Sequence, residues 1–451
     1  MDSHRLRLDS LHLRNFRSFE DFGIDFHGRL TVIVGGNGYG KTAALDAIAV
    51  ALGPFVGGFD DGRDCYFQRE DIRRIRVKGS NRMELADGGI GLRATGIVDS
   101  EPVSWNREFS GPKSRTTRKG AQRLSEFAKR LQSQVRREAD VGVHGACLPV
   151  VAYYGTDRLW NIRRMPHKPL PRTSRMVGYT HSLESGSDFH LMAEWLRYWS
   201  YAALEHRHKA QGKDEARLPS EADNALEAVR KAINVCLSPS GWGDIDFSIE
   251  SQEIVARHPQ MGELPVAMLS DGIRNMLTLV ADIAFRAVKL NPNLGPYAAI
   301  EAEGIVLIDE VDMHLHPAWQ QTVLASLREA FPRIQFIVTT HSPQVLSTVH
   351  RDNIRVLAQD TIGMMSAVQP LAKTYGELSG DVLEAVMHVD PQAPIPERDD
   401  LRRLTELVDQ GDFRGAEAMI LRQKLKGSLG EQHPQLQRIE RSIQRQALLK
   451  P

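Results

Sequence analysis

The first third of the chain alternates apolar and polar residues with the two-residue period of β-strands. Residues 6–34 contain LRLDSLHLRNF and GIDFHGRLTVIV, which predict antiparallel strands that lead into a buried strand ending at Val34. Residues 86–110 predict hairpins, and the apolar run LPVVAYY at 148–154 predicts a fully buried strand. The pattern therefore predicts an antiparallel lobe beside a buried sheet.

Apolar residues at helical spacing dominate the middle and the end of the chain. Helices are predicted at about 120–139, 188–210, 221–236, 272–290 and 317–330. Further strands are predicted at 244–256 and from the apolar stretches GIVLIDE and QFIVTTH. This alternation predicts an α/β fold with an antiparallel β lobe, a helical insertion and a helical tail.

A glycine-rich loop follows the first buried strand. The sequence GGNGYGKT at 35–42 matches the pattern G-x-x-x-x-G-K-[ST]. Glycines permit backbone angles at which successive N–H groups face phosphates, and the apolar helix that follows presents its N-terminus to the same anion. We expect Lys41 to reach the β- and γ-phosphates of ATP and the Thr42 hydroxyl to hold Mg²⁺. The expected ATP-binding residues of this loop are Asn37, Gly38, Gly40, Lys41 and Thr42.

Two later strands end in residues suited to ATP hydrolysis. The stretch GIVLIDEVD at 304–312 is an apolar strand that ends in two carboxylates. We expect Asp309 to be a Mg²⁺ ligand, usually through water, and Glu310 to be the base that polarises the attacking water. His341 directly follows the strand QFIVTT, where an imidazole can hydrogen-bond the γ-phosphate; the alternative is a histidine that caps a turn.

A third element of the expected site precedes a long helix. In LSDGIRN at 269–275, Ser270 and the backbone N–H groups around Gly272 would form an anion site at a helix N-terminus. This stretch lies far from the first loop in the sequence, which suggests a dimer in which Ser270 of one copy closes over the ATP held by the other. The tetrapeptide alone is a weak signal, and its specificity comes from the order of all four motifs.

The motif order resembles that of the ABC-type ATPases, and within them the SMC, RecF and OLD-like AAA_21-type group. The opening LHLRNFRSFEDFGIDFHGRLTVIVGGNGYGKT is similar to that group's opening, and the resemblance implies that Arg17 lies near the nucleotide. Two features depart from the ABC pattern. Asp271 replaces a signature glycine, and AYYGTDRLW stands where a Q-loop glutamine is expected, with Gln68 as a distant candidate.

A narrower resemblance comes from EVDMHLHPAWQQ, YYGTDRLW, LSDGIRNMLTLVADIA and the tail stretch TYGELSGDVLEAVMHVD. These segments resemble the ATPase subunits of the anti-phage systems Septu and Septu-bearing retrons. The resemblance implies a slow, regulatory ATPase that oligomerises, at least as a dimer, and controls a separate HNH nuclease. It also implies contact with a retron reverse transcriptase and its msDNA as a further option.

Other functions stay open at this stage. The main alternative is a RecF- or SMC-like DNA-repair ATPase that acts directly on DNA. A soluble subunit of a membrane transporter fits the motif order but not the SMC-like opening. His314 and His316 could be metal ligands, although a place in the loop after Glu310 suits them better. No nuclease motif is recognised after His341.

Composition narrows the setting of the protein. Lys+Arg and Asp+Glu both number 57 in 451 residues, so any nucleic-acid contact must come from a local patch. The three cysteines are far apart, which suits a reducing cytoplasm. A signal core and a run of 18 apolar residues are both missing from the sequence, so we expect a cytoplasmic protein without a membrane segment.

Two basic segments and the tail are the remaining candidates for partner contacts. Residues 113–137 and 158–175 are rich in Lys and Arg and could contact DNA through its phosphates; a solvated or protein-binding face explains them equally well. We expect a head at 1–372, with helical insertions at about 112–145 and 180–240, and a helical interaction region at 373–451 that docks a partner. The tail residues expected to pack together are Leu404, Leu407, Phe413, Ala416, Met419, Ile420 and Leu425.

Overall fold

The computed structural model describes residues 5–77, 79, 81–142, 145–157, 174–186, 189–209, 219–361 and 363–449. The chain forms two compact units, Met1–Met387 and His388–Pro451. The division falls later than the expected head boundary at 372. Helix α10 (Ser379–Ala385) belongs to the first unit because Val382 and Val386 are buried in its core.

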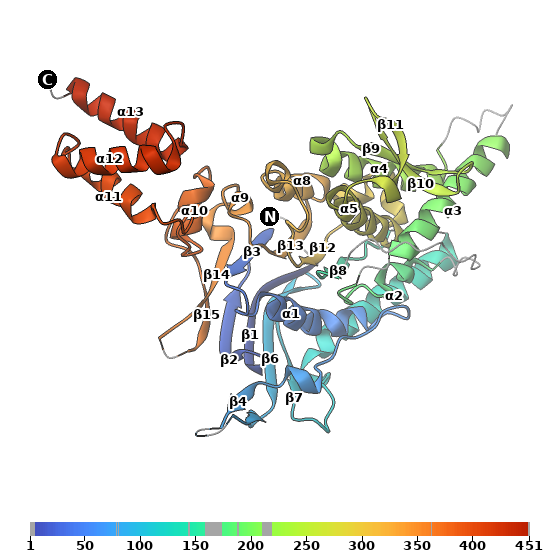
Figure 1. Ribbon diagram of the computed structural model, residues 1–451. Helices are drawn as coiled ribbons and strands as arrows, with labels where there is room; N and C mark the ends of the chain where they lie inside the picture. Colours follow the sequence, from blue (N-terminus) through green and yellow to red (C-terminus); the bar gives the residue numbers. More distant parts are fainter. Residues whose placement is uncertain are drawn as a thin grey trace. The chain divides into compact units, whose positions relative to one another are not determined.

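The centre of the first unit is a sheet with the strand order β15-β14-β3-β13-β12-β8 (Figure 1). Neighbouring strands are parallel except β15, which pairs antiparallel with β14. The strands are β3 (Leu30–Gly35), β8 (Val150–Tyr154), β12 (Gly304–Ile308), β13 (Ile334–Thr339), β14 (Ile354–Gln359) and β15 (Met365–Val368). β8, β12 and β13 are buried along their whole length, as expected for parallel strands covered on both faces. β14 and β15 were not among the predicted elements.

An antiparallel sheet with the order β2-β1-β6-β7 forms the predicted lobe. Its strands are β1 (Leu6–Phe16), β2 (Phe19–Asp25), β6 (Ile90–Val98) and β7 (Glu101–Phe109), and a short hairpin joins β4 (Arg74–Arg76) to β5 (Met83–Leu85). Gln335 of β13 ties the lobe to the central sheet. Its Oε1 accepts from the Leu8 N–H at 2.9 Å, and its Nε2 donates to the Leu8 carbonyl at 2.7 Å.

Helices surround the central sheet and form the insertion. The long helices are α1 (Lys41–Val56), α2 (Gln122–Val141), α3 (Phe189–Lys209), α4 (Glu221–Leu237) and α5 (Asp271–Leu290). The short helices are α6 (Ala298–Glu301), α7 (Pro317–Gln320), α8 (Val323–Ala330) and α9 (Pro343–Leu346). The predicted helix at 317–330 is therefore two helices, α7 and α8.

The predicted strand at 244–256 is a hairpin in the structure. β9 (Gly243–Ser248) pairs with β10 (Glu253–His258), which also pairs with β11 (Gly262–Pro265). A turn at 249–252 separates β9 from β10, and Gln252 in it has a φ of 57°. The polar pair Ser251-Gln252 interrupts the alternation of apolar residues. Such an interruption signals a turn, and the strand prediction did not take it into account.

The second unit is a bundle of α11 (Arg398–Asp409), α12 (Ala416–Leu429) and α13 (Pro434–Leu449). Leu404, Leu407 and Leu425 are in its core as predicted, and Phe413 packs against it. The prediction was wrong for Ala416, which is exposed, and for Met419 and Ile420, which are 61% and 67% exposed. The inward face of α12 instead carries Ala418, Leu421, Leu425 and Leu429, at helical spacings that leave residues 419 and 420 on another side.

Candidate nucleotide site

The glycine-rich loop connects the end of β3 to the start of α1. Gly38 and Gly40 have φ values of 81° and 89°, in the left-handed region that favours glycine. Gly40 is constrained further because a Cβ there would lie 2.6 Å from Cζ of Phe19. Phe19 belongs to β2 and stacks on Phe22, so the antiparallel lobe supports the loop from one side.

Lys41 is the first residue of α1, and its ammonium group folds back over the loop. Nζ donates to the Gly35 carbonyl at 2.9 Å and to the Gly36 carbonyl at 3.2 Å. Burial lowers the pKa of Lys41, while the negative charges of Asp309 and Glu310 act in the opposite direction. Asn37 and Gly38 are exposed at the tip of the loop. The Lys41 ammonium group, close to the backbone of an exposed glycine-rich loop, is suited to binding a phosphate chain.

Thr42 and Asp309, the two expected Mg²⁺ ligands, are in direct contact. The Thr42 hydroxyl donates to Oδ2 of Asp309 at 2.7 Å. Asp309 is 1% exposed, and its other oxygen accepts from the Thr339 hydroxyl. A hydroxyl and a carboxylate are oxygen donors of the kind that Mg²⁺ prefers, so this pair fits the metal.

Glu310 and His341 lie beside the same group of residues. Glu310 has a φ of 48°, and its N–H donates to the Thr339 hydroxyl at 2.7 Å. Burial first, and then the positive charge of Lys41, lowers the pKa of His341, with Glu310 and Asp309 acting in the opposite direction. His341 is therefore a neutral imidazole near pH 7 that can either donate or accept a hydrogen bond.

Thr339 is a site residue that the sequence analysis missed. Its hydroxyl donates to the Asp309 carboxylate and accepts from the Glu310 N–H, so one side chain fixes two expected site residues. Thr340 donates in the same way to Asp312. The available signal was the pair of threonines at the end of the strand before His341.

Ser270 and Gly272 lie at the start of α5, and the first turn of this helix packs on the segment after β12. Ser270 is the exposed N-cap of α5, and its side chain makes no capping hydrogen bond. A Cβ at Gly272 would lie 2.4 Å from the His314 carbonyl, and Asn275 Nδ2 donates to the Met313 carbonyl at 3.1 Å. Within the described residues, no hydrogen bond joins Ser270 or Gly272 to the loop at 35–42.

Arg17 contacts carboxylates of its own chain. Its Nη1 lies 2.5 Å from Oδ2 of Asp46, on α1, and its Nε lies 2.8 Å from Oδ1 of Asp71. Arg17 has a φ of 50°, and its N–H donates to the Asp71 carbonyl at 2.7 Å. The structure thus places Arg17 beside the helix that carries Lys41, with its guanidinium held by two acids.

His316, the second histidine after Glu310, has a structural role. His316 is the N-cap of α7, and its Nδ1 accepts from the Ala318 N–H at 3.2 Å. Among the described residues, no group of three or more His, Cys, Asp or Glu side chains could hold a metal ion.

The basic side chains of residues 113–137 are exposed, but several are paired within the chain. The ion pairs are Arg118–Asp64, Arg123–Glu101, Arg130–Asp99 and Arg136–Asp60. Lys113, Arg115, Lys119 and Lys129 have no ion pair with another described residue. Most of the second basic segment, residues 158–173, lies outside the described residues.

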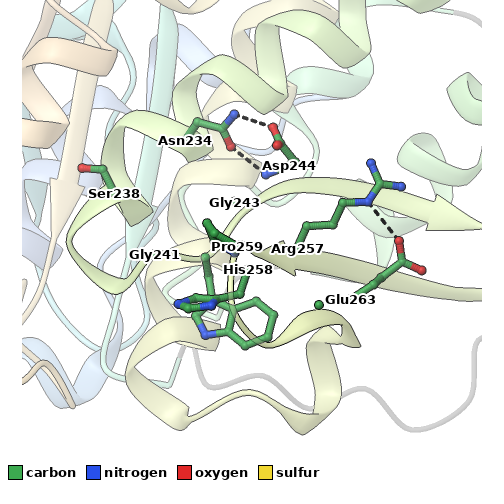
Figure 2. A pocket seen from close by; sticks show the side chains of 11 residues that line it. Asn234, Ser238, Gly241, Gly243, Asp244, Arg257, His258, Pro259 and Glu263 are labelled. Atoms are coloured by element: carbon green, nitrogen blue, oxygen red, sulfur yellow. Dashed lines mark hydrogen bonds and ion pairs between the residues drawn. The ribbon is translucent and has the colours of Figure 1, made fainter.

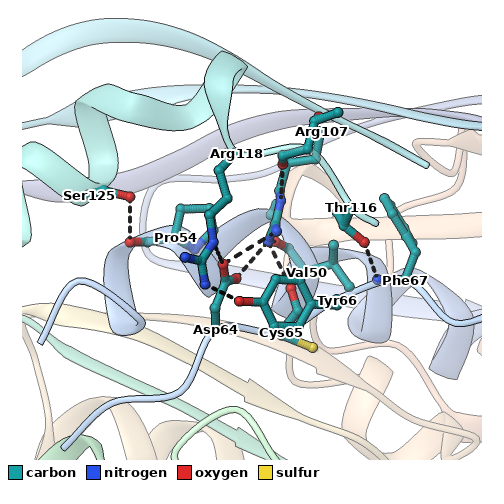
Figure 3. Close-up of polar contacts among 12 residues, drawn as sticks. Val50, Pro54, Asp64, Cys65, Tyr66, Phe67, Arg107, Thr116, Arg118 and Ser125 are labelled. Carbon is teal, nitrogen blue, oxygen red and sulfur yellow. Dashed lines mark hydrogen bonds and ion pairs between the residues drawn. The ribbon is translucent and has the colours of Figure 1, made fainter. Parts of the chain in front are cut away.

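Asp64, the partner of Arg118, joins several polar side chains in one cluster (Figure 3). Its buried carboxylate accepts from Arg107 at 2.8 Å and from Arg118 at 2.8 Å. Both guanidinium groups also lie over the ring of Tyr66. Arg107 is fully buried and donates to the Val50 carbonyl of α1 at 2.8 Å, so the cluster fixes β7 against the end of α1.

A cavity of about 510 Å³ lies beside β9 and β10 (Figure 2). Four of its polar side chains form two pairs: Asn234 donates to Asp244 at 2.8 Å, and Arg257 donates to Glu263 at 3.0 Å. None of the predicted site residues lines it.

In the described part of the chain, no helix has the length and apolar character needed to cross a bilayer.

Two family models match the chain. The first is described as "AAA domain" and matches residues 10–234. The second is described as "AAA domain, putative AbiEii toxin, Type IV TA system" and matches residues 184–347. Between them the two matches include the glycine-rich loop, the LSDG stretch, the acidic strand and His341. They agree with the ATPase interpretation of these motifs.

Several curated proteins are similar to the chain. The Retron Vc95 probable ATPase of Vibrio cholerae serotype O1 biovar El Tor is 25% identical, and the alignment covers 92% of this chain and 85% of that protein. The Retron Ec83 probable ATPase of Escherichia coli is 27% identical, with 79% and 72% covered. The Septu protein PtuA of Bacillus mycoides (strain KBAB4) is 42% identical over 20% of this chain and 12% of its own length. Among solved structures, the SMC head domain from Thermotoga maritima is 17% identical with a TM-score of 0.40, covering 81% of this chain and 100% of that one.

Proposed function

We propose that the chain, an ATPase that matches two AAA-domain models, is the regulatory ATPase of an anti-phage defence complex. In this proposal, ATP controls whether an associated HNH nuclease is restrained or released. The likeness to retron ATPases over most of the chain, and to Septu PtuA over a shorter stretch, supports the link to defence.

The observation that carries the ATPase chemistry is the hydrogen bond between Thr42 and Asp309. It brings together two motifs that are far apart in the sequence, at the point where Mg²⁺ would be held. The metal would neutralise charge on the phosphate oxygens. Lys41 would exchange its bonds to loop carbonyls for phosphate oxygens, with Asn37, Gly38 and Gly40 shaping the backbone around them.

Glu310 would then act as the base for the attacking water. Its backbone N–H donates to the Thr339 hydroxyl, which also donates to Asp309, so one side chain holds the backbone of the base beside the metal ligand. His341, a neutral imidazole beside Lys41, would hydrogen-bond the γ-phosphate and report whether it is present. Hydrolysis by this set is expected to be slow and regulatory. Arg17 would act indirectly, through Asp46 on α1.

Ser270 and Gly272 would complete the site of a second copy. Ser270 is exposed and its hydroxyl does not cap its own helix, so it is available to an incoming phosphate at a helix N-terminus. Gly272 packs on the segment after Glu310 of its own chain, which would link closure of one site to the acidic strand of the other. The assembly is then at least a dimer.

The second unit is the proposed docking point for the nuclease. Met419 and Ile420 are adjacent, mostly exposed apolar side chains on α12, and such side chains are typical of protein contacts.

DNA would contact a different surface, the basic side chains at 113–137. The same surface would contact a retron msDNA together with its reverse transcriptase. Because acids of the same chain pair with several of those side chains, we expect that contact to be weak and sensitive to salt.

Co-expression tests the proposal directly. The tagged chain is produced in the cytoplasm together with its neighbouring genes, and whatever co-purifies is identified by mass spectrometry. A stoichiometric protein with an HNH motif is the expected result. A lone ATPase that retains DNA only when ATP is present would contradict it and support the RecF-like alternative, in which the chain acts on DNA without a nuclease partner.

A further inference from the structure

The dipeptide Tyr153-Tyr154 at the end of β8 contacts the helix that follows the phosphate loop. The Tyr153 hydroxyl donates to Oδ1 of Asp46 at 2.8 Å, and Asp46 lies on α1, which begins at Lys41. The other oxygen of Asp46 accepts from Arg17, so two donors fix this carboxylate. Burial, and then the negative charge of Asp46, raises the pKa of Tyr153. Its hydroxyl is therefore a permanent donor toward α1.

The next residue makes the corresponding contact with the helix that carries Ser270. The Tyr154 hydroxyl donates to Oδ2 of Asp282 at 2.7 Å, and Arg286 donates to the same oxygen at 2.7 Å. Asp282 and Arg286 are one turn apart on α5, and all three side chains are buried. Arg286 continues the network by donating to the Gly178 carbonyl at 2.8 Å.

The backbone of this dipeptide contacts the acidic strand as well. The Asp309 N–H donates to the Tyr154 carbonyl at 2.8 Å, beside the parallel pairing of β8 with β12. Successive side chains of a strand point to opposite faces of the sheet. Tyr153 therefore contacts α1 on one face and Tyr154 contacts α5 on the other, and Figure 1 shows β8 between these two helices.

We infer that Tyr153 and Tyr154 are positioning residues that couple the phosphate loop to the orientation of Ser270. The inference rests on the proposed function, in which Ser270 closes the site of a second copy. Binding of phosphate at Lys41 would shift α1 and Asp46 with it. The tyrosine pair of β8 would transmit that shift to Asp282 on α5. Tyr153 and Tyr154 would thus couple the two helices at the place in the chain where the ABC pattern has its Q-loop glutamine.

Packing alone does not explain the two hydroxyl groups. Phenylalanine would fill the same space, and a buried ion pair such as Asp282–Arg286 is weak evidence for stability because its desolvation cost is high. Asp282 Oδ1 is buried and has no hydrogen-bond partner within the described residues, so the network is incompletely satisfied. An unpartnered buried carboxylate oxygen lowers stability, so a gain in stability does not account for this network.

The test compares Tyr153→Phe and Tyr154→Phe with the wild type in the full chain, using ATP and Mg²⁺. We expect KM for ATP to stay within about threefold while kcat falls by about tenfold, the size expected from losing a hydrogen bond to a charged group. Hydrogen exchange of residues 266–275 gives a second readout. ATP should change the exchange of this segment in the wild type and not in either variant.

Tyr179→Phe is the matched control. Tyr179 is also fully buried, and its hydroxyl donates to the Pro149 carbonyl at 2.7 Å, but it contacts neither α1 nor α5 through that hydroxyl. It should keep the wild-type kcat and exchange response. Wild-type values in both test variants, or an equal loss in Tyr179→Phe, would overturn the inference and leave the proposed function standing. A wild-type chain that does not hydrolyse ATP would overturn both.

Discussion

Arg274 donates a hydrogen bond to the carboxylate of Asp271, three residues earlier at the start of α5. The acidic residue in the LSDG stretch therefore has a counterion within its own helix. A carboxylate next to Ser270 would otherwise repel the phosphates of a second copy's ATP. Arg274 thus offsets the negative charge that Asp271 brings to the signature stretch. The LSDG motif does not include Arg274 and so does not reveal this role.

Arg274→Ala should therefore weaken ATP-driven association of two copies. We expect the dimer dissociation constant measured with ATP to rise by about tenfold, because the exposed Asp271 carboxylate loses its partner. Analytical ultracentrifugation measures this constant. The double variant Asp271→Gly with Arg274→Ala should restore association, and Arg257→Ala, which breaks the exposed pair with Glu263, should have no effect. If the double variant associates as weakly as Arg274→Ala, Arg274 does not act by offsetting the charge of Asp271.

Lys41→Ala should strongly weaken nucleotide binding. Nζ is the only side-chain cation that the structure places over the loop carbonyls of residues 35 and 36 among the described residues. Its loss should weaken ATP affinity by about a hundredfold, as expected for charge-assisted bonds to phosphate. Isothermal titration calorimetry gives the affinity. Lys129→Ala, on the exposed face of α2, serves as a control and should bind ATP normally. Equal affinities for the two variants would contradict the assignment.

Glu310→Gln should separate ATP binding from hydrolysis. The amide keeps the shape of the side chain but cannot accept the proton of water, so kcat should fall by about a hundredfold or more. ATP should still bind, and the variant should accumulate as a dimer in its presence, which size-exclusion chromatography with light scattering detects. A wild-type rate of phosphate release would show that another group is the base.

His341 predicts a pH dependence of stability with a defined sign. Burial and the charge of Lys41 hold its pKa below the ordinary value of 6.5, so the unfolded chain takes up the proton first as the pH falls. The contribution of neutral His341 to stability is complete above pH 6.5 and is lost between that pH and the lower folded pKa.

Replacement of His341 measures this effect. We expect the melting temperature of the wild type to fall more steeply below about pH 6.5 than that of His341→Gln. His208→Gln, an exposed position on α3, provides the comparison for a general effect of histidine removal. Parallel pH profiles for the wild type and His341→Gln would show that burial of this imidazole does not oppose its protonation.

Local patterns located most of the elements because periodicity depends on neighbouring residues alone. The strands of the antiparallel lobe, the long helices α2 to α5 and the buried strands β8, β12 and β13 lie where the sequence predicts them. The errors occurred where a local signal competed with a wider pattern. The turn at 249–252 divides one predicted strand, and α12 turns Ala418 rather than Met419 and Ile420 into the core of the second unit.

The sequence by itself determined the chemical groups of the site, because a glycine-rich loop, an acidic strand end and a strand-end histidine each have a chemistry that can be recognised locally. Only the tertiary structure decided which groups meet. Thr42 contacts Asp309 because parallel strands carry both motifs to one edge of the sheet. The roles of Thr339, Arg274 and the tyrosine pair depend on hydrogen bonds to partners on other elements or on an adjacent helical turn, and no local pattern specifies those contacts.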